Sequence, residues 1–248
     1  MKKEPATPSF LPLYEQIKLL ITRGLSEGEW RPGEAIPSEM ELARRYQVSQ
    51  GTVRKAIDEL VMDNMLVRRQ GKGTFVATLT DEGTNYRFLN LLTLDGEKEY
   101  PSSEFIGFER GKADAQVAKR LDIRPGSALV ILRRVLDFSG KPVVYDDIRL
   151  PAAQLKGITS AMIEDHVNAH KGTLYSLYET RYQIRIISAQ ERIRATVADE
   201  VSAPLLNVAI GTPLLCIERV AFSYNKQPVE WRKSYINTEN YYYFDELN

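Results

Sequence analysis

The sequence predicts an α+β protein with two domains. Residues 13–61 carry the apolar spacing of amphipathic helices, and two short β-prone runs follow within residues 66–77. From residue 88 onward, strand-like and helix-like patterns alternate, and part of this region recurs 85 residues further along the chain. We therefore expect a small N-terminal domain at residues 1–77, a polar linker at residues 78–88 and a larger domain at residues 89–248.

The N-terminal segment predicts three helices in close succession. The apolar face of the first comprises Leu13, Ile17, Leu20 and Ile21. The second begins after Ser38, which stands three residues before Glu41 in the spacing of a capping box. The third has Ser49 as its N-cap candidate. Its apolar face comprises Val53, Ile57, Leu60 and Val61. The short turn at Gln47 and Val48 between the last two helices predicts a helix-turn-helix.

A β-hairpin is predicted directly after these helices. Residues 66–69 and 74–77 are β-prone, and the turn between them contains Gly71, Lys72 and Gly73. Although the whole chain has no net charge, residues 44–76 hold seven Lys and Arg against three acids, a local charge of +4. A basic face of this kind attracts the phosphates of nucleic acid.

Three motifs carry a family resemblance: PSEMELA at 37–43, VSQGTVRKAI at 48–57 and QGKGTFV at 70–76. Their order and spacing resemble the winged helix-turn-helix of the GntR family over about residues 10–77. The resemblance implies that the third helix and the hairpin wing contact an operator. The residues it implies for DNA contact are Arg44, Ser49, Gln50, Gly51, Thr52, Arg54, Lys55, Arg69, Gln70, Lys72 and Gly73.

Two positions depart from the family's common pattern. Gln50 stands where many relatives have arginine, and a glutamine can make a bidentate contact with adenine where an arginine favours guanine. Met40 likewise replaces an arginine common in the family, which removes one DNA contact. We therefore expect an operator that differs from the family's usual one.

A repeat organises the larger predicted domain. Each copy indicates a short helix, a glycine turn, a strand, a hairpin and a second strand. The first copy's positions Ala113, Asp114, Ala118, Leu121, Gly126, Leu129, Arg134, Val135 and Lys141 recur as Ala198, Asp199, Ala203, Leu206, Gly211, Leu214, Arg219, Val220 and Lys226. Two copies are too few for a solenoid. We expect two interleaved halves of one α+β domain, with a cleft between them on a pseudo-twofold axis.

The repeated segments also resemble a known effector domain. Gly126…Arg134…Gly140-Lys141-Pro142 and its second copy resemble the UTRA domain of the HutC subfamily, over about residues 89–245. The resemblance implies a chorismate lyase-like fold and a small effector bound between the halves: a sugar phosphate, a carboxylate or an amino-acid derivative. The residues carried over as effector-binding are Arg133, Arg134, Asp146, Thr173, Tyr175, Glu230 and Tyr235. Leu136 replaces a second arginine of many sugar-phosphate binders, which leaves a carboxylate or another effector open.

Independently of the family, Arg133 and Arg134 interrupt an apolar strand, where a charge needs a partner. Two interpretations stay open: pairing with Asp146, Asp147 or Glu218, or contact with a ligand.

No metal or cofactor is expected. His166 and His170 have the helical spacing that can share a metal, but no third ligand follows at that spacing, which favours an exposed helix face. The single cysteine, Cys216, lies in an apolar run and is expected in the core. The aromatic run at residues 241–244 could stack on bases or on a ligand, but it favours alternating burial at a domain edge or a dimer interface.

Together these features predict a transcriptional regulator that binds a palindromic DNA operator as a homodimer and responds to a small, anionic metabolite. A repressor is favoured, and an activator stays open. The absence of a long apolar run or a signal-peptide pattern predicts a cytoplasmic protein without a membrane partner. Two alternatives stay open. An enzyme would use the arginine-lined cleft for chemistry, although we find no catalytic triad, phosphate loop or metal cluster in the sequence. A scaffold would use the larger domain only to dimerise.

Overall fold

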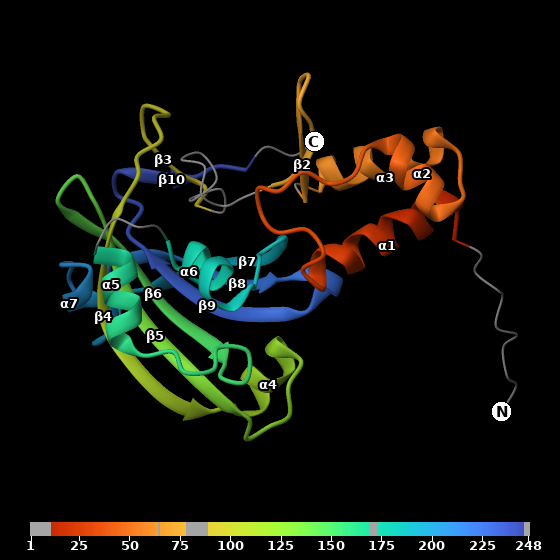
Figure 1. Ribbon diagram of the computed structural model, residues 1–248. Coiled ribbons are helices and arrows are strands. Elements are labelled where there is room, and N and C mark those ends of the chain that lie inside the picture. Colours follow the sequence, from red (N-terminus) through yellow and green to blue (C-terminus); the bar gives the residue numbers. More distant parts are fainter. Residues whose placement is uncertain (1–10, 64, 78–88, 169–172, 246–248) are drawn as a thin grey trace, which may run out of the picture. The chain divides into compact units, whose positions relative to one another are not determined.

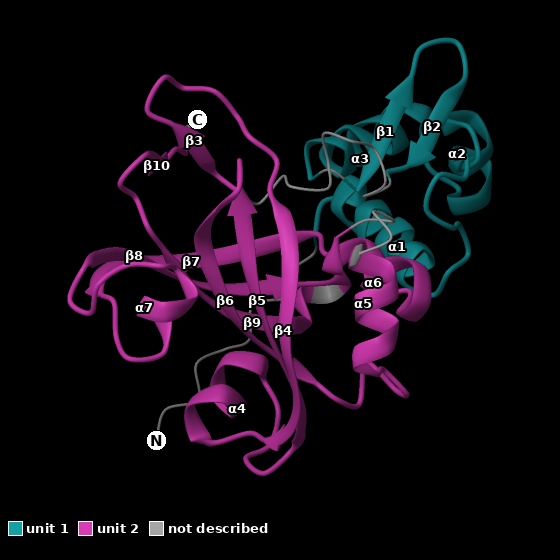
Figure 2. Cartoon of the chain, turned by 90° about the vertical axis from the view of Figure 1, so that its left-hand side faces the viewer, with its two compact units in different colours: residues 1–78 teal, residues 79–248 magenta. Residues whose placement is uncertain are grey.

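A computed structural model describes residues 11–63, 65–77, 89–168 and 173–245. The chain divides into two compact units, residues 1–78 and 79–248 (Figure 2), and each is described here by itself. The predicted linker at 78–88 and the predicted helix-face residue His170 lie outside the described residues. Within the described ranges, no helix is both long and apolar enough to cross a bilayer.

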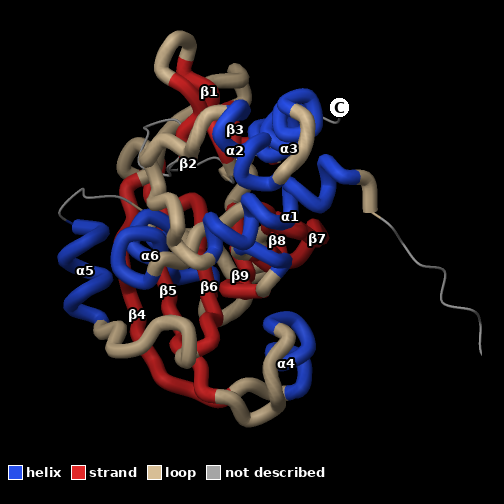
Figure 3. Tube along the Cα trace, turned by 45° about the vertical axis from the view of Figure 1, so that its right-hand side comes forward, coloured by secondary structure: helices blue, strands red, loops and turns tan. Residues whose placement is uncertain are grey.

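The first unit contains the predicted helices and hairpin (Figure 3). Its elements are α1 (Leu13–Ser26), α2 (Glu39–Tyr46), α3 (Gln50–Met62), β1 (Leu66–Arg69) and β2 (Gly73–Val76). Both hydrogen bonds of the predicted capping box are present, because the Ser38 side chain accepts from the Glu41 amide while the Glu41 carboxylate accepts from the Ser38 amide. Gln47 ends α2 with a φ of 55°, which turns the chain sharply into α3.

The expected apolar face of α1 was partly wrong. Leu13 and Leu20 are 58% and 46% exposed, whereas Ile17, Ile21 and Leu25 are buried. At 100° per residue the buried stripe is centred near Ile21, so Leu13 and Leu20 project from its margin. On α3, Val53, Ile57 and Leu60 are buried as expected, but Val61 is only half-buried.

The second unit is built on a six-stranded antiparallel sheet in the order β4-β5-β6-β9-β8-β7 (Figure 1). Its strands are β4 (Ser102–Lys112), β5 (Ala128–Phe138), β6 (Lys141–Pro151), β7 (Ser188–Val197), β8 (Pro213–Phe222) and β9 (Pro228–Ile236). A separate antiparallel pair joins β3 (Leu91–Thr93) to β10 (Tyr241–Tyr243). The helices are α4 (Ala115–Leu121), α5 (Ser160–Asn168), α6 (Leu174–Tyr182), α7 (Ser202–Leu205) and the 3₁₀ turn η1 (Tyr224–Lys226).

The sheet follows the 85-residue repeat. The units β4-α4-β5-β6 and β7-α7-β8-β9 meet edge to edge where β6 pairs with β9. The repeated glycines perform the same turn: Gly126 and Gly211 have φ values of 82° and 87°, and their amides donate to the carbonyls of Ala113 and Ala198. Only glycine adopts such φ values without strain.

The two halves exchange their helices. Helix α4 of the first half packs on Trp231 of β9, in the second half, while α7 of the second half packs on Tyr145 of β6. The halves are therefore interleaved through their helices, although their strands lie in two contiguous blocks. Helices α4 and α7 share one face of the sheet, because their packing partners on β5 and β6, Leu129 and Tyr145, are directed to the same side.

The opposite face of the sheet is covered by α5, α6 and the β3–β10 pair. Helices α5 and α6 bury an apolar cluster against side chains that include Leu132, Ile148 and Leu150. The β3–β10 pair covers a second cluster that includes Leu136, Val144 and Ile236. We call this face the α6 face, since its polar site lies beneath α6.

Candidate nucleic-acid interface and effector site

The start of α3 presents a polar surface in the first unit. Ser49 is the N-cap, as predicted, and its Oγ accepts from the Thr52 amide at 3.1 Å and lies 2.8 Å from the Thr52 hydroxyl. In this first turn Gln50, Gly51 and Arg54 are exposed, because α3 buries its other side against α1 and α2. A helix that exposes its first turn in this way can enter the major groove.

One carboxylate links this turn to the wing. Glu39, the first residue of α2, accepts from Arg54 Nε at 2.9 Å, from Gln50 Nε2 at 3.3 Å and from Arg68 Nη2 at 3.1 Å. Arg68 also pairs with Asp58, with 2.6 Å between Nη1 and Oδ1. Burial raises the pKa of Glu39, but the hydrogen bonds from Arg54 and Gln50 outweigh burial and leave this pKa below its usual value.

Backbone hydrogen bonds hold the wing against the segment between α1 and α2. The amide of Ile36 donates to the carbonyl of Thr74 at 2.9 Å. At the tip, Gly71 and Gly73 have φ values of 70° and 110°. The Arg69 guanidinium lies over the ring of Phe75, 4.7 Å from its centroid. Lys55, on α3, lies over the Tyr14 ring at 3.9 Å.

All eleven residues predicted to contact DNA lie in this unit, and all except the half-buried Thr52 are exposed. They come from the last turn of α2, the first turns of α3 and the wing. Sequence reasoning did not single out Glu39. Its position within the PSEMELA motif was visible, but its three contacts depend on how α2, α3 and β1 pack.

The α6 face of the second unit contains a buried charged cluster. Asp146, on β6, is fully buried, and its Oδ2 accepts from Arg134 Nε at 2.8 Å and from Arg232 Nη1 at 3.1 Å. Its Oδ1 accepts from the Ser234 hydroxyl at 2.5 Å. Burial raises the pKa of Asp146, but the charges of Arg232 and Arg134 outweigh it and lower this pKa below its usual value.

A second buried carboxylate, Glu230, completes the cluster. Arg232 donates to both Glu230 oxygens, at 2.9 and 3.1 Å. The hydroxyls of Tyr175 and Tyr178, on α6, donate to the same two oxygens at 3.0 and 3.1 Å. Burial first, and then the charge of Glu230, raise the pKa of Tyr175 to about 12. The two tyrosines therefore remain hydrogen-bond donors at neutral pH.

The structure brings four of the seven predicted effector residues together: Arg134, Asp146, Tyr175 and Glu230. Thr173 is the N-cap of the helix that carries Tyr175. The remaining two lie on the opposite face of the sheet. Arg133 pairs there with Glu109 at 2.5 Å, and Tyr235 stacks on Tyr145 with 5.8 Å between ring centroids. Adjacent residues of a strand face opposite sides, so Arg133 and Arg134 belong to different sites.

Arg134 pairs with Asp146, one of the three structural partners considered from the sequence. Neither Asp147 nor Glu218 is its partner, because Asp147 pairs with Arg149 and Glu218 with Arg120.

Sequence reasoning missed four members of this region. They are Tyr178, Arg219, Arg232 and Ser234. Arg219 is the repeat equivalent of Arg134. Arg232 follows Glu230 by two positions, which places Arg232 and Glu230 on one face of β9. These two were therefore available from the repeat and from strand periodicity. Tyr178 and Ser234 required the packing of α6 and the register of β9.

The cluster can recognise a ligand only by exchanging partners. Its guanidiniums are matched by the carboxylates of Asp146 and Glu230, so an anion would have to compete with one of them for Arg134 or Arg232. Arg219 pairs instead with Glu191 on the edge strand β7, at 2.5 Å. The arginines are therefore available to an anionic ligand at the expense of internal ion pairs.

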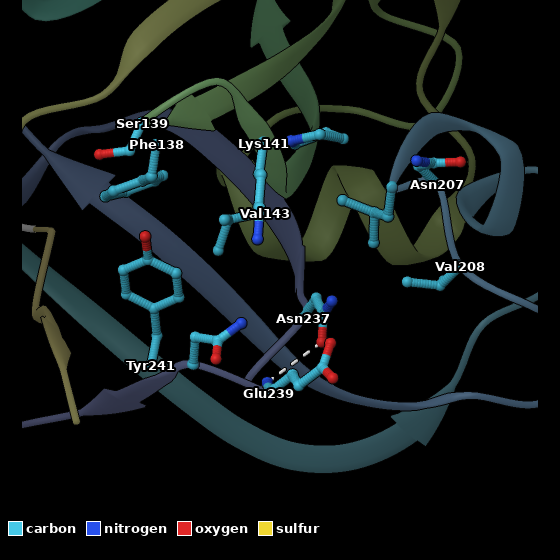
Figure 4. Close-up of a pocket in the computed structure, with 12 residues that line it drawn as sticks. Phe138, Ser139, Lys141, Val143, Asn207, Val208, Asn237, Glu239 and Tyr241 are labelled. Carbon is cyan, nitrogen blue, oxygen red and sulfur yellow. Dashed lines mark hydrogen bonds between the residues drawn. The ribbon is translucent and has the colours of Figure 1, made fainter.

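A separate cavity of about 380 Å³ lies elsewhere in the second unit (Figure 4). Its lining includes Phe138, Lys141, Asn207, Asn237 and Tyr241, from the β5–β6 hairpin, the loop after α7 and the segment before β10. None of the seven predicted effector residues lines it. No residue of the charged cluster lines this cavity, so the two are separate sites.

Other side chains noted in the sequence have structural contacts. His166 lies 2.8 Å from the Ser176 hydroxyl, between α5 and α6. Cys216 is buried, as expected. Tyr241 and Tyr243 belong to β10, where their hydroxyls donate to Glu99 and Glu191. Among the described residues, no group of three or more His, Cys, Asp or Glu side chains is placed to hold a metal ion.

Two sequence families match the chain. The profile described as bacterial regulatory proteins, gntR family, matches residues 13–76, and the UTRA domain profile matches residues 97–242. The chain is 30% identical over 224 residues to the "Probable fructoselysine utilization operon transcriptional repressor" of Escherichia coli (strain K12), covering 88% of this chain and 87% of the relative. It is 28% identical over 220 residues to the histidine utilization repressor of Pseudomonas putida, covering 88% and 85%.

Solved structures also match the chain. The ligand-binding domain of a GntR-family regulator from Bordetella bronchiseptica aligns with a TM-score of 0.62 and 33% identity, covering 66% of this chain and 99% of that chain. PhnF from Mycobacterium smegmatis aligns with a TM-score of 0.54 and 23% identity, covering 94% and 99%. The second likeness shows the shared fold. The relatives named here are regulators and repressors, which supports a regulator over an enzyme.

Proposed function

The chain belongs to the GntR family of bacterial regulatory proteins and carries a UTRA domain, and from this we propose that it is a homodimeric repressor controlled by a small anionic metabolite. In this proposal residues 1–77 read the operator, residues 78–88 connect, and residues 89–248 sense the effector and dimerise. The observation that carries the proposal is the exposed first turn of α3 beside a basic wing, in a chain matched over nearly its whole length by named repressors.

We assign direct operator contacts to the first turn of α3. Gln50 would contact base edges, with Ser49 and Thr52 beside it, and Arg54 would reach a phosphate or a base. Lys72 and Gly73, at the wing tip, would approach the backbone or the minor groove. A homodimer would place two such helices about one turn of DNA apart, so the operator would be palindromic.

The effector would bind at the charged cluster of the α6 face. The preference for an anion is supported by three buried arginines, Arg134 on β5, Arg219 on β8 and Arg232 on β9, whose side chains share one face of the sheet. The tyrosine hydroxyls would donate to a polar ligand, as they now donate to Glu230. A carboxylate or a phosphate would replace Asp146 or Glu230 as the partner of a guanidinium.

A chain of hydrogen bonds supports a route from this cluster to the linker. Arg219 donates to Glu191 at 2.6 Å, and Glu191 accepts a hydrogen bond from Tyr243. The Tyr243 hydroxyl in turn accepts from Asn90 Nδ2 at 3.1 Å. Asn90 lies two residues after the end of the predicted linker. An effector that moved Arg219 would therefore act, through Glu191 and Tyr243, on the chain next to the linker that joins the two units. For switching to follow, the operator affinities of the two states must differ.

The test begins with the full-length protein and a library of random DNA duplexes. We expect repeated selection to enrich a palindrome, and fluorescence anisotropy on that duplex should show binding that weakens steeply as salt rises. Absence of any enriched sequence, or binding that salt does not change, would overturn the proposal.

The sensing claim has its own measurement. A thermal-shift panel of sugar phosphates, dicarboxylates and amino acids should contain a compound that raises the melting temperature and changes affinity for the selected duplex. In Arg134→Met that compound should lose its effect. If no anion in the panel stabilised the protein, the assignment of an anionic effector would fail, while the DNA-binding assignment would stand.

A further inference from the structure

The Glu39 carboxylate is the point where three separate elements of the DNA-reading surface meet. It lies at the start of α2, and its partners come from α3 (Gln50 and Arg54) and from the wing (Arg68). The Glu39 side chain is only 19% exposed, whereas those of Arg54 and Arg68 are 58% and 44% exposed. The carboxylate therefore lies beneath the basic side chains and accepts their hydrogen bonds on the side away from solvent.

We propose that Glu39 is a positioning residue that sets the sequence preference of the protein by holding Gln50, Arg54 and Arg68 as one preordered constellation. The inference rests on the proposed DNA-binding function, and it assigns Glu39 no contact with DNA. Met40, the next residue, is 55% exposed. Of these two neighbouring positions, Met40 faces solvent, whereas Glu39 accepts the hydrogen bonds of Gln50, Arg54 and Arg68.

Stability gives no sufficient reason for an acid at this position. An ion pair with a half-exposed arginine contributes little to folding, and so does a negative charge in the first turn of a helix. A negative charge beside the phosphate-binding face also opposes the attraction of DNA. An acid at position 39 therefore lowers affinity for DNA of any sequence. In return, the hydrogen bonds to Glu39 fix the rotamers of the long arginine side chains before DNA binds, so less conformational entropy is lost on binding.

The contact with Gln50 is the part that bears on sequence. A glutamine amide has two N–H donors and one carbonyl acceptor. Glu39 accepts one N–H, at 3.3 Å, and this contact sets which way the amide faces. The carbonyl oxygen and the second N–H remain, and these are the pair that a bidentate contact with adenine requires. Without Glu39 the amide could rotate and present either edge.

Two substitutions separate charge from geometry. Glu39→Gln removes the charge at constant size, whereas Glu39→Asp keeps the charge but is one methylene too short to reach both α3 and the wing. Glu27→Gln is the matched control, since Glu27 is an exposed acid of the same unit that pairs with Arg23, four residues before it on α1. Each full-length variant is measured by anisotropy on the duplex selected by the unaltered protein and on a scrambled duplex.

We expect both Glu39 variants to lose about tenfold in the ratio of selected to scrambled affinity, the discrimination of one bidentate base contact. Glu39→Gln should also bind the scrambled duplex more tightly, whereas Glu39→Asp should not. Glu27→Gln should leave the ratio unchanged. In the Gln50→Ala background, Glu39→Gln should change the ratio much less, because the residue through which it acts is gone.

Several outcomes would overturn the inference. If both Glu39 variants kept the ratio of selected to scrambled affinity, Glu39 would only repel DNA. If the effects of Glu39→Gln and Gln50→Ala on this ratio were fully additive, Glu39 would not act through Gln50. Loss of folding by Glu39→Asp, seen as a collapsed melting temperature, would assign Glu39 a structural role instead. Failure of the unaltered protein to select any sequence would instead overturn the proposed function itself.

Discussion

Each unit of the protein uses carboxylates to hold arginines, but at different depths. In the first unit Glu39 gathers Arg54 and Arg68 at the surface, and the arginine side chains are about half exposed. In the second unit Asp146 gathers Arg134 and Arg232 in the interior, where no side chain of the three is more than 8% exposed. Both networks are arginine–carboxylate ion pairs, but the first is in contact with solvent and the second is shielded from it.

The difference in depth separates two uses of one interaction. An exposed arginine can leave its carboxylate for a DNA phosphate at little cost, because water screens both states. A buried arginine that loses its carboxylate is left uncompensated in a medium of low dielectric. The surface network is therefore suited to rapid exchange with DNA, and the buried network is suited to holding one arrangement until a ligand replaces a partner.

The largest effect is expected from Asp146→Ala. This change leaves the Arg134 guanidinium without its buried counter-charge and leaves Arg232 with Glu230 alone. It should lower the free energy of unfolding by about 3–5 kcal/mol. Chemical denaturation measures the loss. Glu109→Ala removes the partner of Arg133 on the opposite face, where the Glu109 side chain is exposed, and it should lower the free energy of unfolding far less. Equal losses in the two variants would show that burial does not set the cost of removing an arginine's carboxylate partner.

The next effect is expected from Tyr178→Phe. The change removes one hydrogen bond to the buried Glu230 carboxylate, which retains Arg232 and Tyr175, and should lower the free energy of unfolding by about 1.5–3 kcal/mol. Denaturation of Tyr182→Phe, on the last turn of the same helix, supplies the control. A Tyr178→Phe variant as stable as the control would mean that Glu230 does not need this donor.

An alkaline limb of stability is expected from Tyr175. Its pKa is raised in the folded protein to about 12 by burial and by Glu230, so the folded state favours the protonated phenol. The stabilisation is complete below pH 10 and is lost as pH rises toward 12, by about 1 kcal/mol at pH 11. Denaturation at pH 8 and pH 11 should show a smaller difference for Tyr175→Phe than for the unaltered protein. Equal differences would show that Tyr175 does not contribute.

The smallest change in stability is expected in the first unit, from Gly51→Ala. No atom comes closer than 3.8 Å to the position of an added Cβ, so the fold does not require glycine here. Alanine should raise the free energy of unfolding by about 0.5–1 kcal/mol through helix propensity. Operator affinity should nevertheless fall, because the added methyl projects from the surface that we propose meets DNA. If stability rose and operator affinity did not fall, DNA does not approach closely at Gly51.

Local signals made the first unit predictable in detail. The capping box at Ser38, the N-cap at Ser49 and the glycine turn of the wing depend on residues within a few positions of one another. The prediction that Leu13 and Leu20 are buried was wrong. Apolar spacing identifies an apolar stripe along a helix, but it does not show how much of the stripe's width the neighbouring helix covers.

The repeat made the frame of the second unit predictable, but not its charged cluster. Equal spacing identified the paired turns at Gly126 and Gly211 and the two matching halves. The repeat places Arg134 and Arg219 in equivalent positions, yet one pairs with Asp146 and the other with Glu191. Symmetry of sequence therefore did not extend to symmetry of partners.

By itself the sequence determined the order of elements, the helix caps and the two-part organisation of the fold, because each depends on spacing along the chain. Spacing also indicated the exposed residues that we propose contact DNA. Only the tertiary structure decided that Glu39 joins α3 to the wing, that Arg133 and Arg134 belong to opposite faces, and that Asp146 meets Arg232 across the β6–β9 junction. The reason is physical: a charge selects its partner by distance and burial, and both are set by strands and helices that lie far apart in sequence.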